Sequence, residues 1–281
     1  MKTASLITHS HPDAASEAVA LAASLARESG WRLVADEAEI AKHGDAARGV
    51  EPAARDEAPD LCLVLGGDGS ILHALRRHAG TGVPVFAVNF GTVGFLAAVE
   101  RGEAAAGIAR AFAGEIETIE MPGLEVSVGG RTAIGLNDVT LARRPQDRVA
   151  ELAYKIAGEE VGHVRCDGLV AATPAGSTGY NLANHGPILA WGVKGYVVSY
   201  IAPHSLTARA LVVAPDDVLH VANAAAGGAP VDVALDGERL AGLGPGDELE
   251  VSFREGVGRL AQLPGSSFYQ RIREKFGHLA V

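Results

Sequence analysis

The sequence is poor in cysteine: of its 281 residues only Cys62 and Cys166 are cysteines, and they lie far apart. Two such cysteines exclude a disulfide framework and a cysteine-rich zinc site, and they fit a reducing compartment. No apolar run reaches the roughly 18 residues that a membrane-spanning helix needs. The first residues, MKTASLITHSHPD, lack the apolar segment of a secretory signal. We therefore expect a soluble, cytoplasmic protein without a membrane partner.

Positive charge is also scarce. Lysine and arginine together number 24, against 34 aspartate and glutamate residues, which gives a net charge of −10. Binding to nucleic acid depends on clusters of basic residues, so we expect no nucleic-acid partner. The acidic balance does not exclude a phosphate-bearing small molecule, because backbone N–H groups and helix N-termini bind phosphate even on an acidic protein.

Several familiar catalytic motifs are missing. The chain has no G-x-x-x-x-G-K-[ST] loop, which excludes a Walker-type nucleotidase. A G-x-G-x-x-G dinucleotide loop fails because its last position is Leu72. A G-x-S-x-G nucleophile elbow fails because Ala175 stands two residues before Ser177. The ten histidines show no metal-ligand spacing, so we predict no metal ligand among the side chains.

The order of the apolar stretches predicts two domains. Residues 1–115 alternate between strand-like and helix-like segments, which is typical of an α/β domain on a parallel sheet. Its expected strands and helices are 4–9, 13–30, 31–36, 60–69 with a closing glycine turn, 70–80, 83–91 and 102–115. Short alternating stretches over 116–265 favour a mostly-β, sandwich-like domain. The tail, 266–281, is expected to hold a helix that packs back on the first domain.

The segment LVLGGDGSIL, 63–72, places three glycines around Asp68 directly after an apolar strand. In a parallel α/β sheet, ligands bind at the carboxyl ends of the strands. Glycine lets the backbone come close to a ligand, and a carboxylate at that place can take a proton from a sugar hydroxyl. The alternative is that Asp68 only caps the following helix and that the glycines form a tight turn.

Two further segments are candidates for ligand binding. VRCDGLVAATPAGSTGYNLANHGPIL, 164–189, is rich in hydroxyl and amide side chains, and we interpret it as a polar, ligand-facing loop with Tyr180 for stacking. The alternative is a glycine-rich connection within the β domain. In GLNDVTL, 135–141, Asn137 and Asp138 interrupt a strand. They form either a bulge or a pair of hydrogen-bonding groups for a ribose or a base.

Together these segments resemble the ATP-NAD kinase family. The resemblance covers nearly the whole chain and rests on motifs in the family's order: GGDG at 66–69, NFGTVGFLA at 89–97, NDV at 137–139, DGLVAATPAGSTGY at 167–180, PHSLTARALVV at 203–213 and LDG at 235–237. GGDG alone is a weak signal, because lipid kinases share it. The TPAGSTGY run in combination with the other motifs is specific.

The resemblance implies a phosphotransferase that moves a phosphoryl group to the 2′-hydroxyl of the adenosine ribose of NAD and so makes NADP. The donor is expected to be ATP with Mg²⁺, and polyphosphate is the alternative donor. Asp68 would accept the proton of the hydroxyl, as its place in the loop also indicates. Relatives assemble through the β domain, so a homodimer or homotetramer is expected.

By the same resemblance, a set of residues is expected to contact the dinucleotide, with Phe95 packing on the adenine. These residues are Gly69, His73, Phe95, Asn137, Asp138, Arg148, Arg165, Asp167, Ala175, Thr178, Gly179, Tyr180, Asn181, Leu182, Ala183 and Glu238. Three positions depart from the family: Ala175 replaces a hydroxyl residue, Gly179 replaces an alanine, and His185 stands where glycine is usual. None of them removes Asp68 or the Asn-Asp pair, so we expect catalysis to persist.

Two alternative functions keep part of the pattern. A lipid kinase would share GGDG, but it would need an exposed apolar face and would leave TPAGSTGY unexplained. A catalytically silent, NAD-binding sensor would keep the fold and the binding loops. The intact Asp68 disfavours the sensor.

Overall fold

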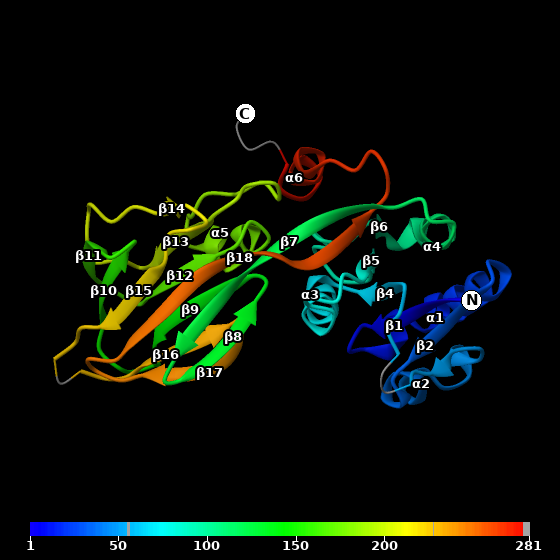
Figure 1. Cartoon of the computed structure of the whole chain (residues 1–281), viewed down its shortest axis with the longest axis horizontal. Helices are drawn as coiled ribbons and strands as arrows, with labels where there is room; N and C mark the ends of the chain where they lie inside the picture. The colour runs from blue at the N-terminus through cyan, green and yellow to red at the C-terminus, as the bar shows by residue number, and fades with distance from the viewer. Residues whose placement is uncertain (55–56, 227, 278–281) are drawn as a thin grey trace. The chain divides into compact units, whose positions relative to one another are not determined.

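The computed structural model describes residues 1–54, 57–226 and 228–277. Residues 278–281 of the predicted C-terminal tail lie outside this range. The chain divides into two compact units (Figure 1): the first is Met1–Glu120 together with the chain from Gly258 onward, and the second is Met121–Val257. Among the described residues, none of the helices has the length and apolar character that crossing a membrane requires.

The first unit is an α/β structure. Its strands are β1 (Lys2–Thr8), β2 (Trp31–Ala35), β3 (Glu51–Pro52), β4 (Leu61–Gly66), β5 (Pro84–Asn89), β6 (Val99–Glu100) and the C-terminal end of β18 (Glu248–Gln262). Its α-helices are α1 (Ser16–Glu28), α2 (Glu37–His43), α3 (Asp68–Arg77), α4 (Ala104–Phe112) and α6 (Phe268–Phe276). Short 3-10 turns cover Pro12–Ala14, Gly44–Ala47 and Arg101–Glu103.

The sheet of this unit is parallel, with the order β3-β2-β1-β4-β5-β18 and with β6 beside β5. Strand β4 is buried along its whole length. Its Leu61, Leu63 and Leu65 share a core with the apolar faces of α1 and α4, while α3 packs against β4 and β5. A strand buried on both faces explains the unbroken apolar run before the GGDG loop.

The second unit is mostly β. Its strands are β7 (Glu117–Val128), β8 (Arg131–Gly135), β9 (Asp138–Arg143), β10 (Ala150–Ile156), β11 (Glu159–Cys166), β12 (Gly168–Ala172), β13 (Tyr196–Ile201), β14 (Leu211–Val213), β15 (Leu219–Asn223), β16 (Val231–Leu235), β17 (Glu238–Leu243) and the first part of β18. A 3-10 turn (Gly176–Thr178) and helix α5 (Tyr180–Ala183) follow β12.

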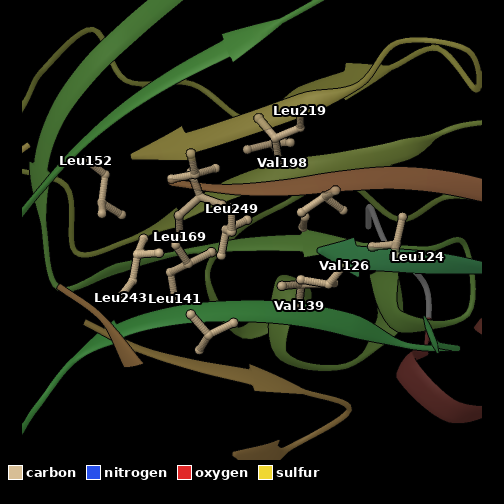
Figure 2. Packing of buried hydrophobic residues seen from close by; sticks show 14 of the residues in the cluster. Leu124, Val126, Val139, Leu141, Leu152, Leu169, Val198, Leu219, Leu243 and Leu249 are labelled. Carbon is tan, nitrogen blue, oxygen red and sulfur yellow. The ribbon is translucent and has the colours of Figure 1, made fainter. Parts of the chain in front are cut away.

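Two antiparallel sheets form this unit. One has the order β14-β13-β12-β9-β16-β17, and the other contains β11-β10-β15-β18. Apolar side chains from both sheets, such as Leu141, Leu169 and Leu249, meet in one core (Figure 2). Alternating inward residues that fill the space between two sheets are the packing of a β-sandwich. The predicted fold class, an α/β domain followed by a mostly-β domain, is therefore confirmed.

Strand β12 is buried on both faces. Leu169 and Ala171 point into the sandwich core, whereas Val170 and Ala172 pack with Leu189 of the segment that follows. The polar segment after β12 is thereby fixed to the outer face of the sheet by apolar contacts.

Candidate active site

The GGDG loop joins the buried strand β4 to helix α3. The helix begins at Asp68, two residues earlier than predicted, with Gly67 as its N-cap. A Cβ atom on Gly67 would lie 3.2 Å from the Cα of Gly91, and one on Gly91 would lie 2.8 Å from the Cα of Gly67. Two backbone segments therefore touch here, which only glycine permits. Gly69 differs, since nothing lies within 4 Å of its Cβ position, and it leaves open space.

The Asp68 carboxylate bonds to a distant loop rather than to its own helix. Its two oxygens accept hydrogen bonds from the backbone N–H groups of Phe95 (2.9 Å) and Leu96 (2.8 Å). The interpretation of Asp68 as a simple helix cap is wrong, because no side chain caps α3. Each oxygen keeps a second lone pair, so the carboxylate is oriented and can still accept a proton.

Asn89, at the end of β5, shapes the loop that Asp68 contacts. Its Oδ1 accepts a bond from the N–H of Gly91 (3.0 Å), and its Nδ2 donates to Glu100 (2.9 Å). Gly94 has φ +64°, and a Cβ atom there would overlap the Asn89 amide. The NFGTVGFLA motif is thus a loop folded around the side chain of its first residue.

A cleft of about 470 Å³ opens beside the GGDG loop. Gly69 and His73, both predicted as site residues, lie along it, together with Ile7, Thr8, His9, Ser10, Asp36, Glu39, Lys42, Gly67, Ser70 and Arg77. Its two permanent cations are paired with carboxylates: Lys42 bonds Glu39 at 2.9 Å, and Arg77 bonds Asp36. The cleft lies at the carboxyl ends of β1 and β4, where parallel sheets bind ligands.

In the second unit, the bend that leads from β8 into β9 includes Asn137 and Asp138, and Asp138 is the first residue of β9. The Asp236 carboxylate accepts the N–H groups of Leu136 (2.9 Å), Asn137 (2.7 Å) and Asp138 (3.1 Å). These bonds hold the bend rigidly. Asp236 belongs to the LDG motif at 235–237, but it was not predicted as a site residue.

The two side chains of the bend are in unusual environments. Asp138 is 8% exposed and accepts a bond from the Thr140 hydroxyl (3.0 Å). Burial, with a smaller contribution from the nearby charge of Asp236, raises the pKa of Asp138 to about 6. The buried Oδ1 of Asn137 finds no hydrogen-bond partner within the described part of the chain. An unsatisfied buried acceptor is costly, so this oxygen is a polar group that the described residues leave unsatisfied.

The TPAGSTGY segment packs directly against this bend. Thr173 donates to the carbonyl of Leu136 (2.6 Å), and a Cβ atom on Gly176 would lie 2.0 Å from the Asn137 carbonyl oxygen. Thr173, Ser177 and Asn181 are completely buried. Their side chains bond to backbone carbonyl groups and stabilise the fold of the segment. The interpretation of the whole segment as ligand-facing is therefore too broad.

The site residues predicted in this segment separate into two groups. Ala175 and Asn181 are buried, and the Asn181 amide donates to the carbonyls of Ser177 (2.9 Å) and Pro187 (3.0 Å). Its side chain thus faces the interior, contrary to the expectation that it contacts the dinucleotide. Tyr180 is 45% exposed. The partly or fully exposed positions are Thr178, Gly179, Tyr180, Leu182 and Ala183.

His185 departs from the family at a strained position. Its φ is +60°, in the left-handed region that glycine adopts without strain and other residues adopt at a cost of about 1–2 kcal/mol. The next residue, Gly186, is tightly enclosed, since a Cβ there would overlap the Asn181 side chain. The usual glycine at position 185 therefore has a conformational reason.

The remaining predicted residues occupy separate places. Phe95 is only 4% exposed, and its ring packs on Phe268 and Phe276, each with ring centroids 5.8 Å away. These aromatic neighbours cover the ring in this structure, and the packing of Phe95 on adenine stays a prediction. Arg148, Arg165 and Glu238 are exposed on the surface of the second unit.

Asp167 is paired rather than free. Arg143 bonds it at 2.5 Å, and this hydrogen bond with the guanidinium lowers the pKa of Asp167. Both side chains are about one-third exposed, so the pair stabilises the unit little. It does fix the direction of the Asp167 carboxylate at the start of β12.

Comparisons with known proteins give consistent matches over both units. Residues 14–116 match the ATP-NAD kinase N-terminal domain, and residues 136–259 match the ATP-NAD kinase C-terminal domain. The NAD kinase of Symbiobacterium thermophilum is 37% identical over 87% of this chain and 90% of its own length. That of Carboxydothermus hydrogenoformans is 34% identical over 79% of this chain and 80% of its own.

Two solved structures share the fold. The yeast NADH kinase complexed with NADH aligns with a TM-score of 0.85 at 20% identity, covering 100% of this chain and 89% of its own. An NAD kinase from Archaeoglobus fulgidus in complex with ATP aligns with a TM-score of 0.71 at 22% identity, covering 98% of this chain and 97% of its own.

Proposed function

Since the chain belongs to the ATP-NAD kinase family, we propose that it phosphorylates the 2′-hydroxyl of the adenosine ribose of NAD with ATP and releases NADP and ADP. In this reaction the 2′-oxygen forms a bond to the γ-phosphorus while the bond from that phosphorus to the β,γ-bridging oxygen breaks. The hydroxyl proton must leave as the new bond forms. Phosphoryl transfer needs a placed nucleophile, stabilisation of the phosphate charge and an acceptor for this proton.

Asp68 is the proton acceptor in this proposal. The observation that supports it is the pair of hydrogen bonds from the N–H groups of Phe95 and Leu96, which fix both carboxylate oxygens. The carboxylate lies where strand β4 leads into helix α3. A base acts only from hydrogen-bond distance of the proton it takes, so a fixed carboxylate is better prepared than a mobile one. The open space at Gly69 gives a substrate room to approach this loop.

The cleft beside the loop is the proposed place of the donor phosphates. It combines the first turn of α3, whose N–H groups are free to bind an anion, with the side chains of Lys42 and His73. A divalent ion bound to ATP would neutralise phosphate charge in solution and in the complex. The described residues hold no group of three or more His, Cys, Asp or Glu side chains suited to a metal ion, so we assign the ion no protein ligands.

The adenosine part of NAD is assigned to the bend of the second unit. The Oδ1 of Asn137, which has no hydrogen-bond partner among the described residues, can accept a bond from an amino or hydroxyl group. Asp138, with a pKa of about 6, can donate when protonated and accept when ionised. The exposed ring of Tyr180 is the proposed stacking surface of the following segment.

We also propose that the protein acts in the cytoplasm as a homodimer or homotetramer. Both cysteines are free and buried, which fits a reducing compartment. The assembly rests on the family resemblance, and light scattering of the purified chain measures it directly.

The function is tested by measuring NADP formation from NAD, ATP and Mg²⁺ with wild type, Asp68→Asn and the exposed control Asp13→Asn. Wild type and control should form NADP at equal rates. Asp68→Asn should retain NAD binding while its kcat falls by about 10²–10⁴, the usual contribution of a general base. If folded wild type forms no NADP with either ATP or polyphosphate, the kinase assignment fails. If Asp68→Asn turns over normally, only the role of Asp68 fails.

A further inference from the structure

The three residues 95–97 are held from two sides. On one side, the N–H groups of Phe95 and Leu96 bond to Asp68. On the other side, the side chains of Gln262 and Arg271 donate hydrogen bonds to the carbonyl groups of this segment. Arg271 of α6 donates through Nη1 to the carbonyls of Phe95 (3.0 Å) and Ala97.

Gln262, at the end of β18, completes this arrangement. It is 2% exposed, and its Nε2 donates to the carbonyl of Leu96 (3.0 Å). Its Oε1 accepts a bond from Nη2 of Arg271 (2.7 Å). All three carbonyls of the segment are therefore bonded, and Arg271 both binds two of them and orients the residue that binds the third.

The guanidinium is in a partly desolvated place. Burial lowers the pKa of Arg271, while the charges of Glu274, Asp68 and Glu100 act in the opposite direction. Arginine remains charged under these conditions. Its planar set of donors can serve several acceptors at fixed angles, which a lysine ammonium cannot do as well.

We propose that Arg271 is a positioning residue for Asp68: it fixes the segment 95–97, and the N–H groups of that segment fix the carboxylate that takes the proton. This inference rests on the proposed function. Arg271 touches neither the reacting hydroxyl nor the phosphate in this assignment. It affects the reaction only through the orientation of Asp68. Loss of Arg271 should therefore lower kcat and leave substrate binding unchanged.

The test compares four full-length proteins: wild type, Arg271→Met, Arg271→Lys and the control Arg273→Met, which removes an exposed arginine of the same helix. We expect Arg271→Met to lower kcat about 30-fold, since a small misplacement of a catalytic group costs up to about a hundredfold. The KM values for NAD and ATP should stay within about twofold. Arg271→Lys should recover part of the loss, and the control should match wild type.

Two measurements separate positioning from a general structural role. Arg271→Met is also made in the Asp68→Asn background, where it should lower the residual kcat less than about twofold, because coupled residues are non-additive. Hydrogen exchange at the amides of Phe95 and Leu96 should become at least about tenfold faster in Arg271→Met and should stay unchanged in Arg273→Met.

The inference is overturned by an unchanged kcat, by a loss confined to KM, by equal losses in the two backgrounds, or by unchanged exchange at 95–96. If Arg271→Met does not fold, Arg271→Lys decides by the same readouts. An inactive wild type means that the proposed function has failed and the inference with it. An active wild type with unaffected Arg271 variants means that only the inference has failed.

Discussion

At the scale of single residues, Asp138 is a carboxyl group whose acidity the fold weakens by burial. Its carboxyl is buried beside Thr140 and close to Asp236, and its pKa is about 6 in the folded protein against an ordinary value of 3.8. A folded pKa above the unfolded one means that the folded state binds the proton more tightly. The stabilisation is complete below about pH 4 and is lost as the pH rises through 6.

This shift predicts the pH dependence of an Asp138→Asn variant. Asparagine keeps an acceptor for Thr140 and cannot ionise, so the variant should gain in relative stability as the pH rises from 4 to 7. The gain is at most about 3 kcal/mol, because one unit of pKa corresponds to about 1.4 kcal/mol. Chemical unfolding of both proteins at several pH values measures it. A difference that stays constant from pH 4 to 7 would contradict the raised pKa.

At the scale of elements, the sequence predicts most of the helices and strands but few of the long-range contacts between them. Strand β4, helix α3 and the hairpin-like β stretches follow from apolar periodicity and glycine turns. Helix α2 (Glu37–His43) was not predicted, because it is seven residues long and mostly polar. The partners of Asp68 could not be derived either, since Phe95 and Leu96 lie 27 and 28 residues away in a loop without regular structure.

Gly69 of the GGDG motif and Gly91 of the neighbouring NFGTVGFLA loop have different roles, and a matched pair of variants separates them. Gly91→Ala would place a Cβ 2.8 Å from the Gly67 backbone, so we expect the free energy of unfolding to fall by about 1–3 kcal/mol. Gly69→Ala meets nothing within 4 Å and lies within helix α3, so it should not lower stability. It should raise the KM for ATP about tenfold, because the methyl group occupies space proposed for the substrate.

Thermal unfolding and steady-state kinetics on both variants check this. A Gly69→Ala protein with normal KM values for ATP and NAD would show that the substrate does not lie against the GGDG loop at Gly69. A Gly91→Ala protein as stable as wild type would show that the two backbones separate easily. The two outcomes are independent of each other.

At the scale of the whole molecule, each unit includes segments that are far apart in the sequence. The sheet of the first unit takes its last strand from β18, where Arg259 pairs with Pro84. The bend at Asn137 is fixed by Asp236, 99 residues later. Local patterns predict which residues form strands, but not which distant strands pair, because pairing depends on packing summed over the unit. The family resemblance gave the function class, whereas the positions of Asp236, Gln262 and Arg271 needed the structure.

The C-terminal helix should matter to the first unit beyond the proposed positioning of Asp68. Ending the chain at Pro264 removes α6, including the buried Ile272 and two rings that cover Phe95. Loss of such contacts costs about 2–4 kcal/mol. The only two tryptophans report on different units, since Trp31 lies in the first and Trp191 in the second.

Trp31→Phe and Trp191→Phe variants of the full and shortened chains therefore allow each unit to be followed separately by fluorescence during chemical unfolding. We expect the transition reported by Trp31 to move to clearly lower denaturant in the shortened chain, because α6 belongs to that unit. The transition reported by Trp191 should move less. Equal displacement of both transitions would show that the chain unfolds as one cooperative whole, and no displacement would show that α6 contributes little to the stability of the first unit.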